Sequence, residues 1–282
     1  MVSGRAARAR PHPSGRYVTT AAGRGVKGRV TRARQNGSCS APWRQPIDRP
    51  VAVAADPGWR WLYRVGGAAA LALGAAYLAT IPLYASVGAP PRGGEAWLSY
   101  AAGKTGVWWA ILWLSVLTDL LFLPVSFALF AALAAVHRGA ALIGTSLLLL
   151  FAVLDLAVTW SSYGALIRLA EGHAAATTEA QRLATVAAAE YASASLAFGL
   201  GTYSILVPSL GILVVGLVML GGVFGKGIAY LGVGTGILGV VSVVGPLVAS
   251  ALGATIILTS VLTAVWVLLV GVRLYRLATV RI

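Results

Sequence analysis

The residues of this sequence best suited to chemistry are two aspartates, Asp119 and Asp155, which lie inside long apolar runs. A charged side chain in membrane hydrocarbon costs at least ~2.5–3.5 kcal/mol, so such residues usually face the interior of a helix bundle and have a function. The two runs are joined by a turn at His137–Arg138, and each aspartate is about 18 residues from that turn. We therefore predict that the two carboxyl groups lie at nearly the same depth.

Other polar residues continue the helical faces that carry the two aspartates. They repeat at helical spacing on each run: Ser115, Asp119 and Ser126 on the first, and Asp155, Thr159 and Ser162 on the second. No Lys or Arg lies at the same depth in any apolar run, so burial and mutual repulsion would favour a bound proton or cation. The candidate proton or cation site therefore comprises Asp119, Asp155, Ser115 and Thr159. The alternative is that each acid is protonated or hydrogen-bonded and only holds the helices together.

No other catalytic or metal-binding pattern stands out. The three histidines, His12, His137 and His173, are isolated from one another in the sequence, and the single cysteine is Cys39. The sequence has no H-E-x-x-H motif, no Cys pair and no G-x-S-x-G motif. We expect no catalytic residue, no metal and no cofactor, and we predict that the protein is not an enzyme.

Glycines near the C-terminal end of the chain form two motifs. Gly234, Gly236 and Gly239 match G-x-G-x-x-G, which indicates dinucleotide binding only between a strand and a helix. These glycines lie in an apolar run, where Gly232 and Gly236 also form G-x-x-x-G. That spacing is typical of close packing between membrane helices, and this is the role that we predict for Gly232 and Gly236.

The composition identifies the kind of protein that must position these residues. Of 282 residues 58% are apolar and 11% are charged, and the mean hydropathy is +0.82. Soluble domains are ~45–50% apolar and ~25% charged, so a soluble enzyme, a disordered chain and a disulfide-rich scaffold are all excluded. A multi-pass membrane protein remains.

Six apolar runs are long enough to cross a bilayer, which takes ~20 residues in a helix. They cover residues 61–87, 105–136, 139–167, 198–221, 228–248 and 255–277. They lack the alternation, over ~10 residues, of membrane β-strands. We therefore predict an all-α polytopic protein whose six-helix transmembrane domain covers 59–282.

Residues 1–58 are predicted to be a disordered basic tail, because the segment is polar, lacks apolar periodicity and has scattered prolines. The first 64 positions hold 13 of the 22 basic residues. Such a tail can contact anionic lipid headgroups, which we expect as a partner beside the bilayer itself. We expect no nucleic acid, and the sequence indicates no specific protein partner. The alternative is a solvated extension without function, or a translation start near Val51.

The orientation follows from the basic residues near the ends of the runs. With the N-terminus in the cytoplasm, nine fall inside: Arg44, Arg49, Arg60, Arg64, Arg138, Lys226, Arg273, Arg276 and Arg281. Four fall outside: Arg92, Lys104, Arg168 and Arg182. This model also places six aromatic residues near the outer boundary as interfacial anchors: Trp108, Trp109, Trp113, Trp160, Tyr163 and Tyr203. We predict that both termini are cytoplasmic. Arg greatly outnumbers Lys and the chain is rich in Ala and Gly, which is typical of GC-rich bacterial genomes, so we predict a bacterial inner membrane.

Two outer segments are less regular. Residues 179–197 are helix-prone but polar, and we interpret them as an extension of the run at 198–221, which Pro208 would kink. Residues 88–104 form a loop rich in Pro and Gly that could make a small cap over the bundle.

The chain resembles an uncharacterised family of bacterial six-helix integral membrane proteins, a domain of unknown function. The resemblance rests on the hairpin VLTDLLFLPVSFALFAALAAVHRGAALIGTSLLLLFAVLDLAVTW, on EAQRLATVAAAEY and on ILVVGLVMLGGVFGKGIAYLGVGTGILG. It covers residues 59–278 and implies a topology but no activity. Two functions stay open: an ion- or proton-coupled transport protein for a small solute that uses Asp119 and Asp155, or a membrane-embedded regulatory or scaffold protein.

Overall fold

The structure is a computed structural model that describes residues 57–88 and 90–279. These residues form helices and short connections, with no β-strand among them, which confirms the all-α class. They belong to one compact unit. The predicted disordered tail lies outside the described residues except for Pro57 and Gly58.

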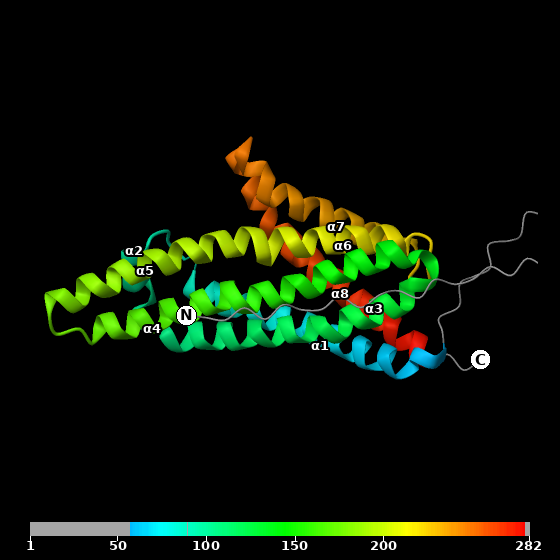
Figure 1. Cartoon of the computed structure of the whole chain (residues 1–282), viewed down its shortest axis with the longest axis horizontal. Coiled ribbons are helices and arrows are strands. Elements are labelled where there is room, and N and C mark those ends of the chain that lie inside the picture. Colours follow the sequence, from blue (N-terminus) through cyan, green and yellow to red (C-terminus); the bar gives the residue numbers. More distant parts are fainter. Residues whose placement is uncertain (1–56, 89, 280–282) are drawn as a thin grey trace, which may run out of the picture. The chain divides into compact units, whose positions relative to one another are not determined.

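Eight α-helices make up most of the described chain (Figure 1). They are α1 (Arg60–Val87), α2 (Gly94–Ala101), α3 (Thr105–Leu154), α4 (Trp160–Ala174), α5 (Glu179–Gly199), α6 (Val207–Met219), α7 (Lys226–Val244) and α8 (Thr255–Thr279). Two π-helical segments, η2 (Asp155–Thr159) and η3 (Leu200–Leu206), join α3 to α4 and α5 to α6. The 3-10 turns are η1 (Pro57–Trp59), η4 (Gly245–Leu247) and η5 (Ser250–Ala254).

Five continuous helical runs in the described part are long and apolar enough to cross a membrane. They are Arg60–Val87, Thr105–Ala174, Glu179–Met219, Lys226–Leu247 and Ser250–Thr279. Length and composition of this kind are those of a polytopic membrane protein. The predicted extension of the run at 198–221 is confirmed, because α5 continues through η3 into α6 without a break.

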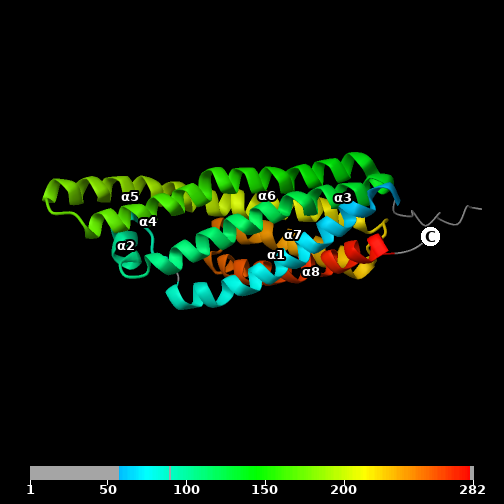
Figure 2. The same cartoon turned by 90° about the horizontal axis from the view of Figure 1, so that it is seen from below.

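The 70-residue run Thr105–Ala174 reverses its direction within α3. Its backbone leaves the helical conformation at His137, where φ is −154° and ψ is 90°. The ring of His137 then accepts a hydrogen bond from the N–H of Ala140 through Nδ1, at 3.1 Å. A side chain in that position satisfies one of the free N–H groups at the start of the next helical arm. Figure 2 shows the two arms of α3 returning along each other.

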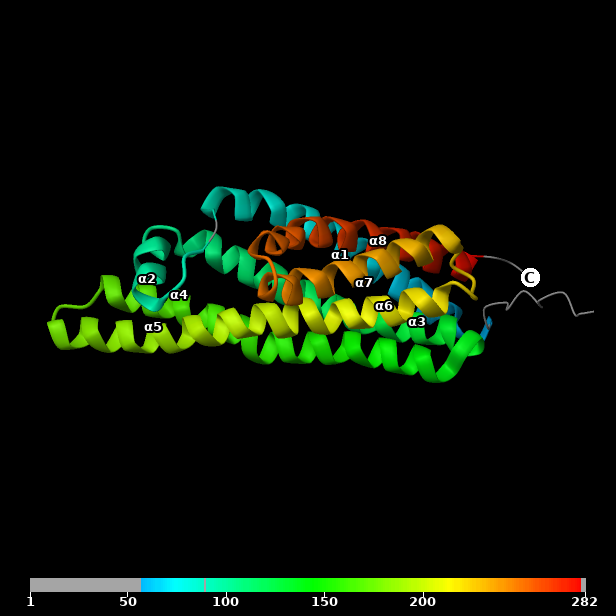
Figure 3. The same cartoon turned by 90° about the horizontal axis from the view of Figure 1, so that it is seen from above.

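The helices pack into two apolar clusters at different levels. At the level of the α3 bend, the bend-side core joins α1, α3, α6, α7 and α8 and includes Phe122, Leu133 and Leu148. Towards the opposite end, the α2-side core joins α2 to α3, α4 and α5 and includes Trp97 and Trp108. In Figures 1 and 3, α4 and α5 extend beyond the connection between α7 and α8.

The loop predicted over residues 88–104 contains the short helix α2, which packs against α4 and α5. The hydroxyl of Tyr100 donates to the carbonyls of Val87 and Gly88, at 2.9 and 2.8 Å. These groups occupy carbonyls left free at the end of α1, and so they attach the loop to the bundle.

Glycines permit the closest approaches between the long helices. A Cβ atom at Gly232 would lie 2.6 Å from Nε1 of Trp266 on α8. A Cβ atom at Gly236 would lie 2.7 Å from the backbone nitrogen of Leu213 on α6. The structure therefore places both residues of the G-x-x-x-G pattern at helix contacts, on two different neighbours.

Candidate functional site

Asp119 of α3 and Asp155 of η2 come together in the interior, and each is only 2% exposed. Nε1 of Trp160 donates to Oδ2 of Asp119 at 2.6 Å. The same indole is also a hydrogen-bonding neighbour of Asp155, and the two carboxylates lie close enough to repel each other electrostatically. We call these two aspartates the acid pair.

Two hydroxyl groups complete the contacts of Asp155. Ser204, on η3, donates to Oδ1 of Asp155 at 2.5 Å and lies 3.4 Å from Oγ1 of Thr159. Thr159 is fully buried and is itself a hydrogen-bonding neighbour of Asp155. Gly199 allows this packing, because a Cβ atom there would lie 2.8 Å from Oγ1 of Thr159. The segment 199–204 thus packs closely against Asp155 and Thr159.

Both helical runs are π-helical where they meet. Asp155 and Thr159 mark the two ends of η2, Ser204 lies in η3, and the two π-helical segments pack against each other. Pro208 contributes, because it has no N–H to donate to the carbonyl of Ser204 in an α-helix. π-Helical turns are rare and are frequent at functional sites. This local geometry presents polar side chains of both runs to one another.

Ser115 lies on the same helical face as Asp119, one turn nearer α2, and is buried. Its carbonyl accepts a hydrogen bond from Oγ1 of Thr118 at 2.6 Å. Among the described residues, Trp160 contacts both aspartates, and Thr159 and Ser204 contact Asp155. Ser115 is not among the hydrogen-bonding neighbours of either aspartate.

Sequence reasoning missed two of these contacting residues. Trp160 was predicted to be an interfacial anchor, but its N–H donates to a buried carboxylate. Ser204 was not singled out, although it lies 16 residues from Leu220, at the turn that ends α6. That distance is close to the 18 residues that separate each aspartate from its own turn. Counting depth for every polar residue would have found Ser204.

The electrostatic surroundings of the acid pair contain no cation among the described residues. The charged group that acts on Asp119 is Asp155. Three tyrosines, Tyr77, Tyr84 and Tyr163, lie within electrostatic reach of Asp155, and Tyr77 is also within reach of Asp119. Over residues 57–88 and 90–279, no group of three or more His, Cys, Asp or Glu could hold a metal ion.

Aromatic rings cover the α2 side of the acid pair. Tyr163 stacks on Trp160 with ring centroids 5.3 Å apart, and on Trp108 with centroids 5.5 Å apart. Trp97 packs against both Trp108 and Tyr163. The acid pair and its hydroxyl neighbours thus form a polar layer between the bend-side core and the α2-side core.

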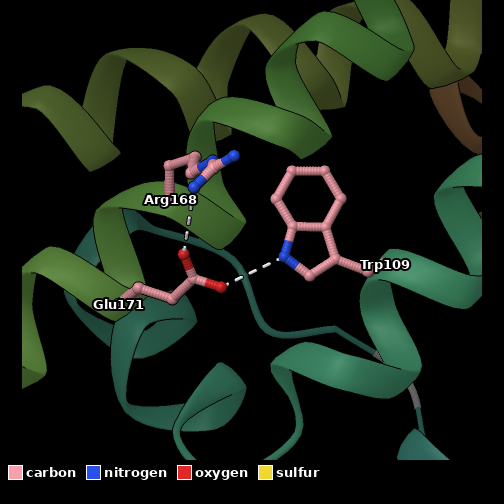
Figure 4. Close-up of polar contacts among 3 residues, drawn as sticks. All are labelled: Trp109, Arg168 and Glu171. Carbon is pink, nitrogen blue, oxygen red and sulfur yellow. Dashed lines mark hydrogen bonds and ion pairs between the residues drawn. The ribbon is translucent and has the colours of Figure 1, made fainter.

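Charged side chains appear again further towards the α2 end. In Figure 4, Nε1 of Trp109 donates to Oε1 of Glu171 at 3.1 Å, and Arg168 lies 3.8 Å from the other carboxylate oxygen. The guanidinium of Arg168 also lies 5.1 Å from the centre of the Trp109 ring. An exposed pair of this kind stabilises the fold by less than ~1 kcal/mol. Both side chains are exposed, at 74% and 39%.

No protein-family model matches this chain, and no similar curated protein or solved structure is found. The functional argument therefore rests on the geometry of the acid pair and on the helices that hold it. The resemblance to a bacterial six-helix family stays a prediction.

Proposed function

We propose that this protein is a six-span membrane protein that binds a proton or a small cation at Asp119 and Asp155 and couples it to transport of a small solute. One observation carries the proposal. Two carboxylates, each 2% exposed, share the neighbourhood of a single indole N–H and have no cationic partner among the described residues.

The charge balance favours a bound cation or proton. Two ionised carboxylates offer acceptors only, whereas Trp160 and Ser204 supply one donor each. Unpaired buried charge is costly, and a proton or a cation held between the carboxylates would remove that cost. The hydroxyl oxygens of Thr159 and Ser204 add oxygen ligands of the type that hard cations prefer.

The proposed topology rests on the reversal at His137. A run of 70 residues is about 105 Å long as a helix, several times the ~30 Å of hydrocarbon, and the bend divides it into two arms of spanning length. Counting each arm as one crossing gives six crossings. With nine basic residues on one side and four on the other, both termini are assigned to the cytoplasm of a bacterial cell.

Proton binding can be tested directly by infrared spectroscopy of the purified protein in lipid. The wild type should show a protonated-carboxyl band that titrates with pH, and Asp119→Asn and Asp155→Asn should each alter or abolish it. Glu190→Gln is the matched control, because Glu190 is an exposed carboxylate on α5. A spectrum that is the same in all four proteins would contradict the proposal.

Coupling to flux is tested in proteoliposomes. Proton uptake under a pH gradient and sodium uptake under a sodium gradient should both be measured, with the same four proteins. We expect uptake of one ion in the wild type and in Glu190→Gln, and its loss in both Asn variants. Wild-type uptake no faster than that of empty vesicles would contradict transport.

The alternative is a membrane-embedded regulatory or scaffold protein, with its basic tail in contact with anionic lipid. The enclosure of the acid pair favours this alternative, because both carboxylates are hydrogen-bonded and nearly inaccessible. Absence of a titrating carboxyl band, together with unfolding of both Asn variants, would support the scaffold function.

A further inference from the structure

We propose that the groove between α4 and α5 is the water-filled entrance through which protons or small cations reach the acid pair. The proposal rests on the proposed function, and it adds a route and a side of access. The entrance lies on the α2 side of the acid pair, and the α3 bend lies on the opposite side.

The groove has a volume of about 450 Å³. Its walls are mostly small side chains: Ala157, Ser161 and Ala165 from η2 and α4, and Ala188, Ala192 and Ser195 from α5. Tyr191 also lines it and is 79% exposed. Ser162 is the most buried polar residue of the lining, at 8% exposure. The groove therefore leads from an exposed aromatic side chain inward to a buried hydroxyl.

Hydroxyl groups continue from the groove towards Asp155. Oγ of Ser162 lies 3.2 Å from Oγ of Ser195, and the Ser162 hydroxyl also donates to the carbonyl of Val158 at 2.7 Å. Thr159 is one helical turn from Ser162 on the same face, as residues three apart in a helix are neighbours. From Thr159 the path passes to Ser204, whose Oγ lies 3.4 Å from Oγ1 of Thr159. It then passes from Ser204 to Asp155, because the same Oγ lies 2.5 Å from Oδ1 of Asp155. The step from Ser162 to Thr159, one helical turn, is thus the part of the route that no hydrogen bond between described residues bridges.

The position of the groove along the helices indicates that water fills it. The wall formed by η2 and α4 begins at Ala157, 19 residues after Arg138, and ends at Leu169, 31 residues after it, or roughly 28 to 46 Å from the bend. The hydrocarbon is ~30 Å thick, so the groove starts near its outer limit. Arg168 and Glu171, which need water or headgroups, flank Leu169 in the sequence at the far end of this wall.

The lining residues also indicate which kind of ion could pass through the groove. It contains no Lys, Arg, Asp or Glu, so it would neither repel nor trap a small cation. Serine hydroxyls can donate to and accept from water, and they can contribute oxygen ligands to a passing cation. Hydrated protons or small monovalent cations fit this chemistry, and a lipid acyl chain is the competing occupant.

Thiol labelling tests the content of the groove. In a Cys39→Ser background, Ser195→Cys and Ala188→Cys place thiols in the groove, whereas Leu117→Cys places one on an exposed apolar position of α3. A charged, membrane-impermeant methanethiosulfonate added to proteoliposomes should label the two groove cysteines from one side and leave Cys at 117 unlabelled. Equal protection of all three thiols would show that lipid fills the groove and would overturn the proposal.

A kinetic measurement then tests the route. After labelling of Ser195→Cys, the carboxyl infrared band should follow a pH jump about tenfold more slowly than before, equivalent to ~1.4 kcal/mol in the barrier, and reach the same final intensity. Labelling of Ala188→Cys, near the exposed rim, serves as a second variant if Ser195→Cys does not fold. An unchanged rate would reject the groove as the entrance while leaving proton binding intact. A protein with labelled groove cysteines but no titrating band would lack the site itself, and both proposals would fall.

Discussion

A single indole N–H lies beside both buried carboxylates, so Trp160 is the residue that connects the acid pair. The hydrogen bond to Asp119 is 2.6 Å long, and leaving a buried acceptor without its donor costs ~1–3 kcal/mol. Tyr163 holds the indole ring in place by stacking on it. The aromatic residues on the α2 side therefore position a donor as well as filling space.

Removing this donor while keeping an aromatic ring at position 160 gives the first prediction. Trp160→Phe keeps a ring against Tyr163 but leaves Asp119 without its N–H, and we expect a loss of ~1–3 kcal/mol in the free energy of unfolding. The measurement is thermal or denaturant unfolding in detergent micelles. Trp113→Phe is the control, because Trp113 is 64% exposed, and it should change the stability by much less. Equal effects at the two positions would show that the indole N–H of Trp160 contributes nothing.

Part of this site could be predicted from the sequence and part could not. Equal distance from the His137 turn was enough to pair Asp119 with Asp155, because a helix converts residue number directly into height. The same count places Ser204 at 16 residues from the turn after α6, but it does not predict the π-helical turn through which Ser204 reaches Asp155. Trp160 was assigned to the membrane interface because its type is typical of that zone, and type alone does not reveal a hydrogen-bond partner.

Two glycines hold α7 close to its neighbouring helices. Gly232 faces the Trp266 ring of α8, and Gly236 faces the backbone of Leu213 on α6. Gly234 lies between them in the sequence and has no atom of another element within 4 Å of a Cβ atom built there. Small residues allow the close packing on which membrane helices depend, since apolar surface alone gives no preference for protein over lipid.

These three glycines provide the second prediction. Gly232→Ala and Gly236→Ala should each lower the free energy of unfolding by ~1–3 kcal/mol, because the added methyl group overpacks a helix contact. Gly234→Ala should be neutral or stabilising by up to ~1 kcal/mol, because alanine is the better helix former. Unfolding of the three purified variants in one detergent measures the difference. A destabilised Gly234→Ala variant would mean that this face of α7 is also in contact.

The short helix α2 is held at both ends. Gly94 lies so close to the backbone of Ala189 and Glu190 on α5 that a Cβ atom would overlap it. Tyr100 and Lys104 donate to the carbonyl of Val87, and the ammonium of Lys104 also lies 4.7 Å from the centre of the Tyr100 ring. Between these attachments, α2 places Trp97 over Trp108 and Tyr163.

The third prediction concerns the docking of α2. Gly94→Ala should release α2 from α5 and expose Trp97, which is 1% exposed in the native fold. Protease digestion of the purified protein should then cleave the segment 88–104 faster than in the wild type. Gly106→Ala is the control, because nothing lies within 4 Å of a Cβ atom at Gly106. An unchanged digestion rate for Gly94→Ala would show that α2 can shift without undocking.

The long helices were predictable and the short ones were not. Twenty or more apolar residues between polar breaks define a spanning helix, and α1, α7 and α8 follow the predicted runs to within a few residues. Helix α2 is only eight residues long and begins at the second of two adjacent glycines, so its sequence resembles a loop. Its helical state depends on packing against α4 and α5, which no local pattern encodes.

Taken as one membrane protein, the described chain has an asymmetry between its two ends. The bend-side core joins α1, α3, α6, α7 and α8, while the α2-side core is built mainly from α2, α4, α5 and the start of α3. A polar layer around the acid pair divides them. Under the proposed topology, we expect the end of the molecule with α2 to extend beyond the hydrocarbon and to be accessible to reagents from that side.

The fourth prediction is topological. In the Cys39→Ser background, His173→Cys in the last turn of α4 should react with a membrane-impermeant thiol reagent added outside intact cells. A cysteine added after Ile282 should react only once the inner membrane is permeabilised. The nine-to-four distribution of basic residues is the physical reason. Labelling of the C-terminal cysteine in intact cells would overturn the assignment of both termini to the cytoplasm.

The bend at His137 has a consequence for how the protein enters the membrane. The reversal at a single non-helical residue leaves only a very short connection between the two arms. We expect the two arms to enter a membrane together as a helical hairpin, which would bring Asp119 and Asp155 together early. Ser204 follows later in the chain, on η3, and would then join an acid pair that is already formed.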